Sequence, residues 1–143
     1  MFKLCGCAVS WKSKRQPTIA TSTTEAEYMA AYFGGSEAIW LRSLLGELGC
    51  TQSEPTKIYS DNQACISITK NPTLKSCAKH ISIKYHFLRE RISTGELLIG
   101  YIRTENEIAD ILTKALAKPQ FENLRDQMGI RSVDEIKEKG LCD

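Results

Sequence analysis

Strand-like and helix-like stretches alternate along the chain, which is the pattern of an α/β or α+β domain. Short runs of apolar and β-branched residues predict strands, and longer runs with apolar residues three and four positions apart predict helices. The predicted strands are residues 4–11, 17–20, 57–60 and 96–102. The predicted helices are residues 24–48, 62–70, 79–93, 104–116, 119–128 and 132–139.

The first long helix has sequence signals at its start, middle and end. Hydroxyl side chains at 21–24 offer an N-cap, and Glu27 stands three residues after Thr24, as in a capping box. Gly34-Gly35 interrupts the helix at a cost of about 1 kcal/mol per glycine relative to alanine. One face of this helix carries leucines, and both tryptophans are expected in the core. These residues are Leu41, Leu44, Leu45 and Leu48, together with Trp11 and Trp40.

The first two predicted strands are joined by a short basic turn, so residues 4–11 are expected to pair with residues 17–20. The other edge of strand 4–11 is expected to face strand 57–60.

Composition and charge narrow the class of protein. The 143 residues are 42% hydrophobic and 25% charged, which are values typical of globular proteins. The net charge of +2 is too small to indicate a nucleic-acid partner by itself. No apolar run approaches 18 residues and no signal peptide is recognisable, so we expect an intracellular protein, cytoplasmic or nuclear, with no membrane partner. The close pair Cys5 and Cys7 lacks the second pair that a zinc site needs, so the cysteines are expected to be reduced.

Three carboxylates occupy positions with a consistent logic. Glu27 lies early in the long helix, Asp61 ends a strand, and Asp110 lies in a later predicted helix. Carboxylate oxygens are ligands that Mg²⁺ prefers, and two such ions about 3.5–4 Å apart can activate water at a phosphodiester. The spacing alone is equally compatible with structural roles, because Glu27 fits a capping box and Asp61 fits an N-cap. Both interpretations stay open at this point.

Five segments, in this order, resemble the ribonuclease H domain of copia-type retrotransposon Pol polyproteins. The resemblance extends from residue 1 to about Ile130. The five segments are residues 8–14 (AVSWKSK), 22–28 (STTEAEY), 58–64 (IYSDNQA), 79–87 (KHISIKYHF) and 109–114 (ADILTK). The resemblance implies a ribonuclease H-like domain at 1–130 with a mixed five-stranded sheet flanked by helices, followed by a C-terminal tail at 131–143.

The resemblance also implies metal-dependent endonucleolytic hydrolysis of RNA in RNA–DNA hybrids. Four carboxylates of the family hold two Mg²⁺ ions, and three of them match Glu27, Asp61 and Asp110. Glu27 is matched rather than Glu25 because it directly precedes Tyr28-Met29-Ala30. The implied partners are the hybrid itself and a reverse transcriptase domain in the same polyprotein, within a retrotransposon particle.

The family's first catalytic aspartate has no counterpart, because the sequence begins inside the second strand of the family pattern. We therefore expect a domain truncated at its N-terminus, lacking the central first strand and inactive by itself. A gap in the sheet would favour strand-swapped self-association. The alternatives are a non-catalytic nucleic-acid-binding remnant, a domesticated domain or an inert pseudogene product.

Basic residues offer candidate contacts to a nucleic-acid backbone. They lie in the predicted turn after the first strand and on the predicted helix 79–93, and they are Lys12, Lys14, Arg15, Lys79, Lys84 and Arg89. A solvated turn and a solvated helix face explain them equally well. His80 and His86 are six residues apart and do not share a helix face, so metal binding there is not expected.

Overall fold

The computed structural model describes residues 1–16, 20, 22–70, 79–131 and 133, with the side chains of 79–83 excepted. The chain divides into two compact units. The continuous unit comprises residues 16–103, and the split unit combines residues 1–15 with residues 104–143.

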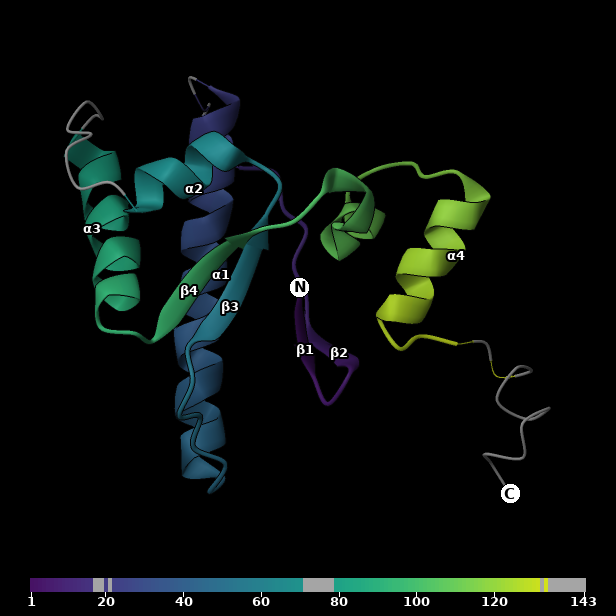
Figure 1. The fold of residues 1–143 in the computed structure, drawn as a ribbon, viewed down its shortest axis with the longest axis horizontal. Helices are drawn as coiled ribbons and strands as arrows, with labels where there is room; N and C mark the ends of the chain where they lie inside the picture. The colour runs from purple at the N-terminus through teal and green to yellow at the C-terminus, as the bar shows by residue number, and fades with distance from the viewer. Residues whose placement is uncertain (17–19, 21, 71–78, 132, 134–143) are drawn as a thin grey trace. The chain divides into compact units, whose positions relative to one another are not determined.

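The described residues of the continuous unit form three helices and a pair of parallel strands (Figure 1). Its elements are α1 (Thr23–Glu47), β3 (Thr56–Ser60), α2 (Gln63–Lys70), α3 (Lys79–Ser93) and β4 (Leu97–Tyr101). β3 and β4 pair in parallel with Thr56 opposite Leu97 and Ser60 opposite Tyr101. Every predicted helix and strand from residue 24 to residue 102 is confirmed, with boundaries that differ by at most one residue.

The start of α1 differs from the predicted capping box. Ser22 is the N-cap, with extended backbone, and its side chain accepts a hydrogen bond from the Glu25 amide at 3.1 Å. The Ser22–Glu25 spacing therefore sets the helix start, and the predicted cap formed by Thr24 and Glu27 is wrong. Glu27 lies in the second turn, beyond the amide groups that an N-terminal cap satisfies.

α1 runs without interruption through Gly34-Gly35, so the predicted break is wrong. The reason is packing at Gly35, where a Cβ atom would stand 2.8 Å from Cδ1 of Leu88 and 3.3 Å from Cδ1 of Leu97. No atom lies within 4 Å of a Cβ built on Gly34. Gly35 therefore allows α1 to approach α3 and β4 closely, and Gly34 has no such role.

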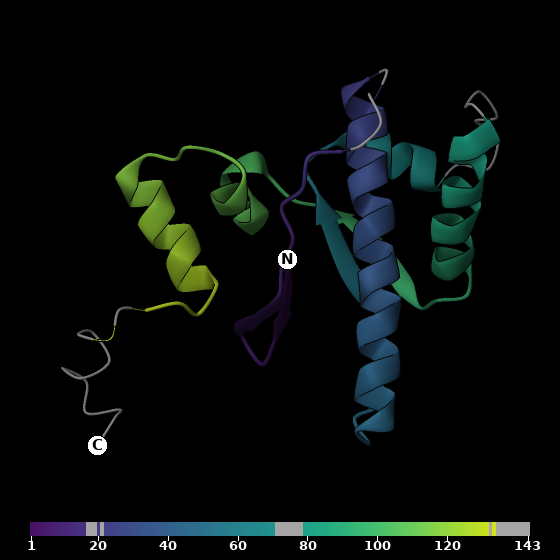
Figure 2. The same cartoon turned by 180° about the vertical axis from the view of Figure 1, so that it is seen from behind.

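The core of this unit joins α1 to α3 and to the strands. The rings of Tyr28 and Tyr85 stack with centroids 3.8 Å apart, and the Tyr28 hydroxyl donates to the Tyr85 carbonyl oxygen at 3.2 Å. Leu88, Leu97 and Ile99 are buried beside them. Figure 2 shows α1, α3 and the strands from behind.

The predicted burial of both tryptophans is wrong, and the leucine face at the end of α1 is not part of the core. The buried positions of α1 lie elsewhere and are Tyr28, Met29, Ala31, Gly35 and Ala38. Leu44 and Leu48 are exposed, and Trp11 and Trp40 are 60% and 57% exposed. Apolar residues occupy opposite sides of α1, and the unit covers only the side that carries Gly35.

The α/β class is confirmed, because helices pack on paired strands. The strands of the described residues form two separate two-stranded sheets, β1 with β2 and β3 with β4. A five-stranded ribonuclease H-like sheet thus stays a prediction. None of the helices described here is both long and apolar enough to cross a membrane.

The split unit begins with a β-hairpin where one strand was predicted. β1 (Phe2–Leu4) pairs antiparallel with β2 (Cys7–Ser10) around Cys5-Gly6. Both turn residues have positive φ, 50° and 86°, as a type I′ hairpin turn requires. The single strand 4–11 is therefore wrong, and residues 7–10 pair with residues 2–4. The predicted pairing with residues 17–20 stays a prediction. Residues 17–19 lie outside the described residues, and Ala20 is not in a strand.

The later part of the split unit contains short helices. The structure has two 3₁₀ helices, η1 (Thr104–Asn106) and η2 (Ile108–Leu112), in place of the predicted α-helix 104–116. Glu107 interrupts the helix with extended backbone, and its side chain accepts from the Ala109 amide at 3.2 Å. α4 (Lys118–Gln127) confirms the predicted helix 119–128. The predicted helix 132–139 lies outside the described residues except for Val133.

The hairpin packs against the end of α4. The Ala8 amide donates to the Met128 carbonyl oxygen at 3.0 Å, and Lys3 Nζ donates to the Gln127 carbonyl oxygen. Gly129, with φ of 76°, lies against Cys7, whose Sγ is 3.2 Å from where a Cβ would be. The two ends of the described chain therefore form one unit.

Candidate metal centre

Glu27 is a half-buried residue of α1. Because Ser22 caps the helix, the carboxylate of Glu27 is not engaged as an N-cap box. The capping-box explanation for Glu27 is therefore wrong.

Asp61 follows the last residue of β3 and is half-buried. The cap of α2 is its neighbour Asn62, whose Oδ1 accepts a hydrogen bond from the Cys65 amide at 2.9 Å. The Asn62 amide in turn donates to Ser60 Oγ at 3.2 Å. The N-cap explanation for Asp61 is thus also wrong, because Asn62 has that role.

Cys65 is a buried thiol in the helix that follows Asp61. It lies in the first turn of α2, four residues after Asp61, and its side chain is fully buried. Burial and, secondly, the negative charge of Glu27 raise the pKa of the Cys65 thiol to about 11, against a hydrogen bond with Thr69 that lowers it. The helices α1 and α2 that carry Glu27 and Cys65 are in contact.

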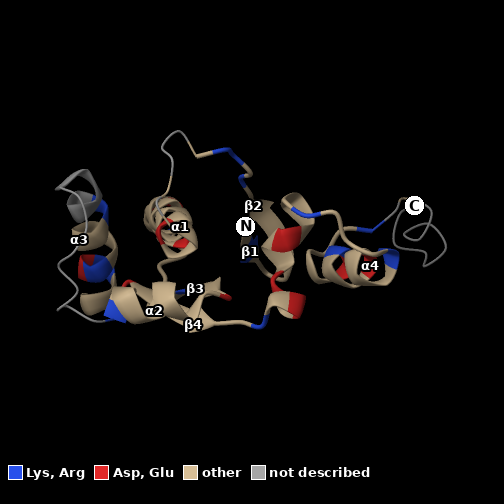
Figure 3. Cartoon of the chain, turned by 90° about the horizontal axis from the view of Figure 1, so that it is seen from above, with Lys and Arg blue, Asp and Glu red and all other residues tan. Residues whose placement is uncertain are grey.

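Asp110 belongs to the split unit, in η2. It is 8% exposed, and its Oδ2 is 2.8 Å from Lys114 Nζ. Acidic positions occur on α1 and in the segment after β4 (Figure 3). Because Asp110 and the other two carboxylates lie in different units, their convergence at one centre stays a prediction.

The donor chemistry of the three residues fits a hard cation. All three offer carboxylate oxygens, the ligand type that Mg²⁺ prefers. In the part of the chain that the structure describes, no group of three His, Cys, Asp or Glu side chains is close enough to hold a metal ion.

The basic residues of the N-terminal region are exposed. Lys12, Lys14 and Arg15 lie in an irregular segment after β2, and the hairpin turn is at Cys5-Gly6 instead. The second strand that would complete a turn here falls on residues 17–19, outside the described residues, so the predicted turn stays a prediction. The exposure of these basic residues is compatible with contacts to a nucleic-acid backbone, which stay a prediction.

The basic residues of α3 make contacts within the protein. Arg89 donates to the Ile68 carbonyl oxygen from Nη2 at 2.9 Å and lies 5.8 Å from the ring centroid of Tyr85. Lys84 Nζ lies 5.7 Å from the ring centroids of Tyr32 and Phe33. Arg89 thus links α2 to α3, and Lys84 contacts an aromatic surface of α1. The side chain of Lys79 lies outside the described residues.

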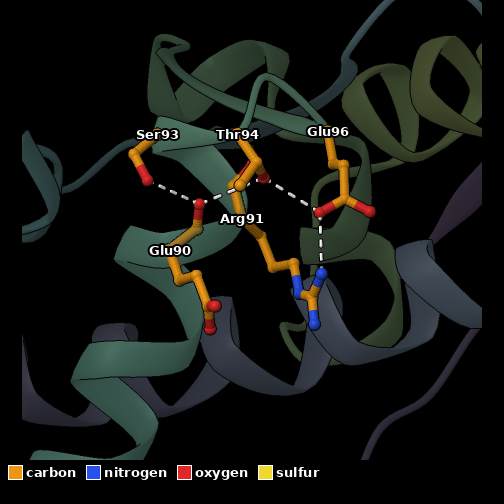
Figure 4. Close-up of polar contacts among 5 residues, drawn as sticks. All are labelled: Glu90, Arg91, Ser93, Thr94 and Glu96. Carbon is orange, nitrogen blue, oxygen red and sulfur yellow. Dashed lines mark hydrogen bonds and ion pairs between the residues drawn. The ribbon is translucent and has the colours of Figure 1, made fainter.

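An ion pair closes the turn from α3 to β4 (Figure 4). Arg91 Nη1 donates to Glu96 Oε2 at 2.9 Å, and Thr94 Oγ1 donates to the same oxygen at 2.9 Å. The hydrogen bond from Arg91 and the one from Thr94 lower the pKa of Glu96 below its ordinary value. Arg91 therefore has a structural role in the turn between α3 and β4.

Sequence comparison shows that the chain is similar to segments of transposon polyproteins. The chain is 41% identical over 132 residues to the retrovirus-related Pol polyprotein from transposon TNT 1-94 of Nicotiana tabacum, covering 92% of the chain and 10% of that protein. It is 39% identical over 125 residues to the one from transposon RE1 of Arabidopsis thaliana, covering 87% and 8%. The Transposon Ty1-NL2 Gag-Pol polyprotein of Saccharomyces cerevisiae is 32% identical over 134 residues, covering 89% and 7%.

Its homologues are retrovirus-related Pol polyproteins of transposons. The chain spans a tenth or less of the length of these curated relatives, so it corresponds to one segment of such a polyprotein. No family model and no solved structure matches the chain.

Sequence reasoning missed one polar contact of the candidate site, the ion pair between Lys114 and Asp110. The four-residue spacing was an available signal, because side chains four apart meet on a helix. Both residues lay in the motif 109–114, but that motif was interpreted for its aspartate only.

Proposed function

We propose that this chain is the ribonuclease H segment of a copia-type Pol polyprotein, acting beside a reverse transcriptase in the same polyprotein. Its reaction is the endonucleolytic hydrolysis of the RNA strand in RNA–DNA hybrids. The proposal is supported by identity of about 40% to Pol polyproteins over most of the chain and by the order of the five motifs.

The observation that carries the assignment of residues is the capping pattern. Ser22 and Asn62 cap α1 and α2, so a capping role does not account for Glu27 or Asp61. Both carboxylates are half-buried, and metal coordination is the role that we propose for them.

In this reaction Glu27, Asp61 and Asp110 hold the metal ligand positions from three different elements. Two Mg²⁺ ions supply an activated water and stabilisation of the leaving oxygen when they are bound. The long α1 and the end of β3 fix Glu27 and Asp61, and the ion pair with Lys114 orients Asp110. Lys12, Lys14 and Arg15 contact phosphates of the hybrid and position it without reading its sequence.

The fourth carboxylate of the family has no counterpart among the 143 residues. With three ligands, a polypeptide of these residues alone binds the cations more weakly, and we expect it to show no robust cleavage. Restoring the strand that bears the family's first aspartate is then expected to restore cleavage.

The test compares two polypeptides, the 143-residue chain and the same chain extended by an N-terminal strand with an aspartate. End-labelled RNA in a hybrid with DNA is incubated with each in Mg²⁺. The extended form is expected to cleave, and Asp61→Asn or Asp110→Asn should reduce its rate by at least about 100-fold. Asp126→Asn is the matched control, because Asp126 is an exposed acid paired with Arg125 in the split unit.

Two results would overturn the proposal. One is strong cleavage by the 143-residue chain that survives Asp61→Asn, and the other is no cleavage by a folded extended form. Binding of the hybrid without cleavage would favour the second candidate, a non-catalytic nucleic-acid-binding domain. The exposure of Lys12, Lys14 and Arg15 favours that candidate, since such contacts need no carboxylate.

A further inference from the structure

The carboxylate of Asp110 is held by a cation of the protein itself. Lys114 Nζ lies 2.8 Å from Asp110 Oδ2, and the two side chains are 51% and 11% exposed. The amides of Thr113 and Lys114 donate to the Asp110 carbonyl oxygen at 3.0 and 2.8 Å. The turn that follows η2 therefore holds the lysine next to the aspartate.

This contact differs from an ordinary surface pair of the same spacing. In α4, Lys118 and Glu122 are also four residues apart, but they are 3.9 Å from each other and are 84% and 48% exposed. Exposed pairs of that kind contribute little to stability. Asp110 is mostly buried, so loss of its partner leaves a charge with poor solvation, which is costly.

We propose that Lys114 is the resident counter-ion of Asp110, which a divalent cation displaces, and that Lys114 thereby sets the metal affinity of the site. The inference rests on the proposed function of Asp110 as a metal ligand. A metal ion needs the carboxylate oxygens that the ammonium holds, and the positive charge beside them opposes a second cation. Because the lysine side chain is half-exposed, it moves into solvent at low cost.

Lys114 is thus a positioning residue with two opposing effects. Without metal it stabilises the split unit, since it compensates the buried carboxylate. With metal it competes, so the same residue weakens binding. A purely structural lysine would produce only the first effect.

The experiment measures Mn²⁺ binding to the 143-residue chain by electron paramagnetic resonance of the free ion, with thermal melts of the same samples. Lys114→Met is expected to tighten Mn²⁺ binding about two- to fivefold, the range that a partly screened ion pair allows. Its metal-free melting midpoint should fall by about 2–8 °C. Added Mn²⁺ should then raise that midpoint more than it does for the unaltered chain.

Two control variants distinguish the effect of a positive charge beside Asp110 from the effect of the net charge of the protein. Lys114→Arg keeps the cation and is expected to bind Mn²⁺ as the unaltered chain does. Lys118→Met removes the same charge four residues later, where the partner is the exposed Glu122, and should leave Mn²⁺ affinity unchanged.

The possible results distinguish this inference from the function on which it rests. If the unaltered chain binds Mn²⁺ and Asp110→Asn weakens that binding, but Lys114→Met does not tighten it, Lys114 is not a displaced counter-ion and the metal-ligand role of Asp110 stands. Equal tightening by Lys118→Met also overturns the inference. If the folded chain extended by the aspartate-bearing strand binds no Mn²⁺, or binds it regardless of Asp110→Asn, both the inference and the metal-ligand role fail.

Discussion

The two units of this protein are stabilised by different kinds of contact. The continuous unit has a 25-residue helix, parallel strands and stacked aromatic rings. The split unit has a three-residue strand, 3₁₀ helices and a few hydrogen bonds between its N-terminal hairpin and the end of α4. Glu27 and Asp61 are thus fixed by long elements, whereas the geometry of Asp110 depends on local polar contacts with Glu107 and Lys114.

This difference predicts that the two units lose structure separately. Leu88 of α3 and Leu124 of α4 are both buried, at 1% and 0% exposure. Replacing either by alanine is expected to cost about 2–5 kcal/mol of unfolding free energy. Hydrogen exchange should show that Leu124→Ala exposes η2 and α4 while α1 and α3 stay protected. Loss of protection in both units with either variant would mean that the protein unfolds as one cooperative structure.

The close packing of the continuous unit is tested by its two adjacent glycines. Gly34→Ala should stabilise the protein by up to about 1 kcal/mol, because alanine favours the helix and meets no atom within 4 Å. Gly35→Ala should instead destabilise it, with overpacking of about 1–3 kcal/mol against Leu88 and Leu97. Chemical denaturation of both variants measures the two signs. Equal stabilisation by both would show that α1 and α3 are not packed closely.

The hairpin of the split unit offers a gain in stability. Cys5 has φ of 50°, a conformation that asparagine tolerates better than cysteine and that type I′ turns favour. Cys5→Asn is therefore expected to stabilise the split unit by about 0.5–1 kcal/mol. Cys7→Asn, in the adjacent strand, is the control and should not stabilise it. Denaturation followed by a probe in the hairpin checks both, and no gain from Cys5→Asn would argue against this turn.

The smallest expected effect is the acid sensitivity of the continuous unit. The hydrogen bond from Arg91, with that from Thr94, lowers the pKa of Glu96 below its ordinary value of 4.5. This pair therefore stabilises the fold above about pH 4.5 and ceases to do so as the pH falls through the lowered pKa. Both side chains are about one-third exposed, which screens the pair. Glu96→Gln should weaken the pH dependence of thermal melting below pH 4.5, and an unchanged acid limb would contradict it.

The sequence predicted the continuous unit well because its elements are long and strongly periodic. In the hairpin the prediction failed because the backbone reverses at Cys5-Gly6, and cysteine is an unusual residue in a type I′ turn. The exposure of Trp11 and Trp40 was unpredictable for another reason. An apolar side chain shows that burial is favourable, but the neighbouring elements decide whether a partner surface is there.

The sequence identifies the candidate site residues only through the order of the motifs that contain them. Glu27, Asp61 and Asp110 followed from that order. The caps of α1 and α2 depend on which hydroxyl or amide side chain starts each helix, and Ser22 could not be chosen over Thr24 from sequence alone. The helix break at Glu107 depends on a hydrogen bond from the Ala109 amide to the Glu107 side chain, which replaces a helical backbone hydrogen bond. The spacing of apolar residues gives no signal for such a bond.

The hydrogen bond between Ala8 and Met128 has a consequence for the order of events during synthesis. A ribosome completes residues 16–103 before it has made α4, so the continuous unit can fold while the hairpin still has no partner. Closing a contact across that long a segment costs chain entropy that grows slowly with length, and prior folding of the intervening residues shortens the effective loop. The split unit is therefore expected to fold last, and its hairpin stays exposed until the end of α4 has been synthesised.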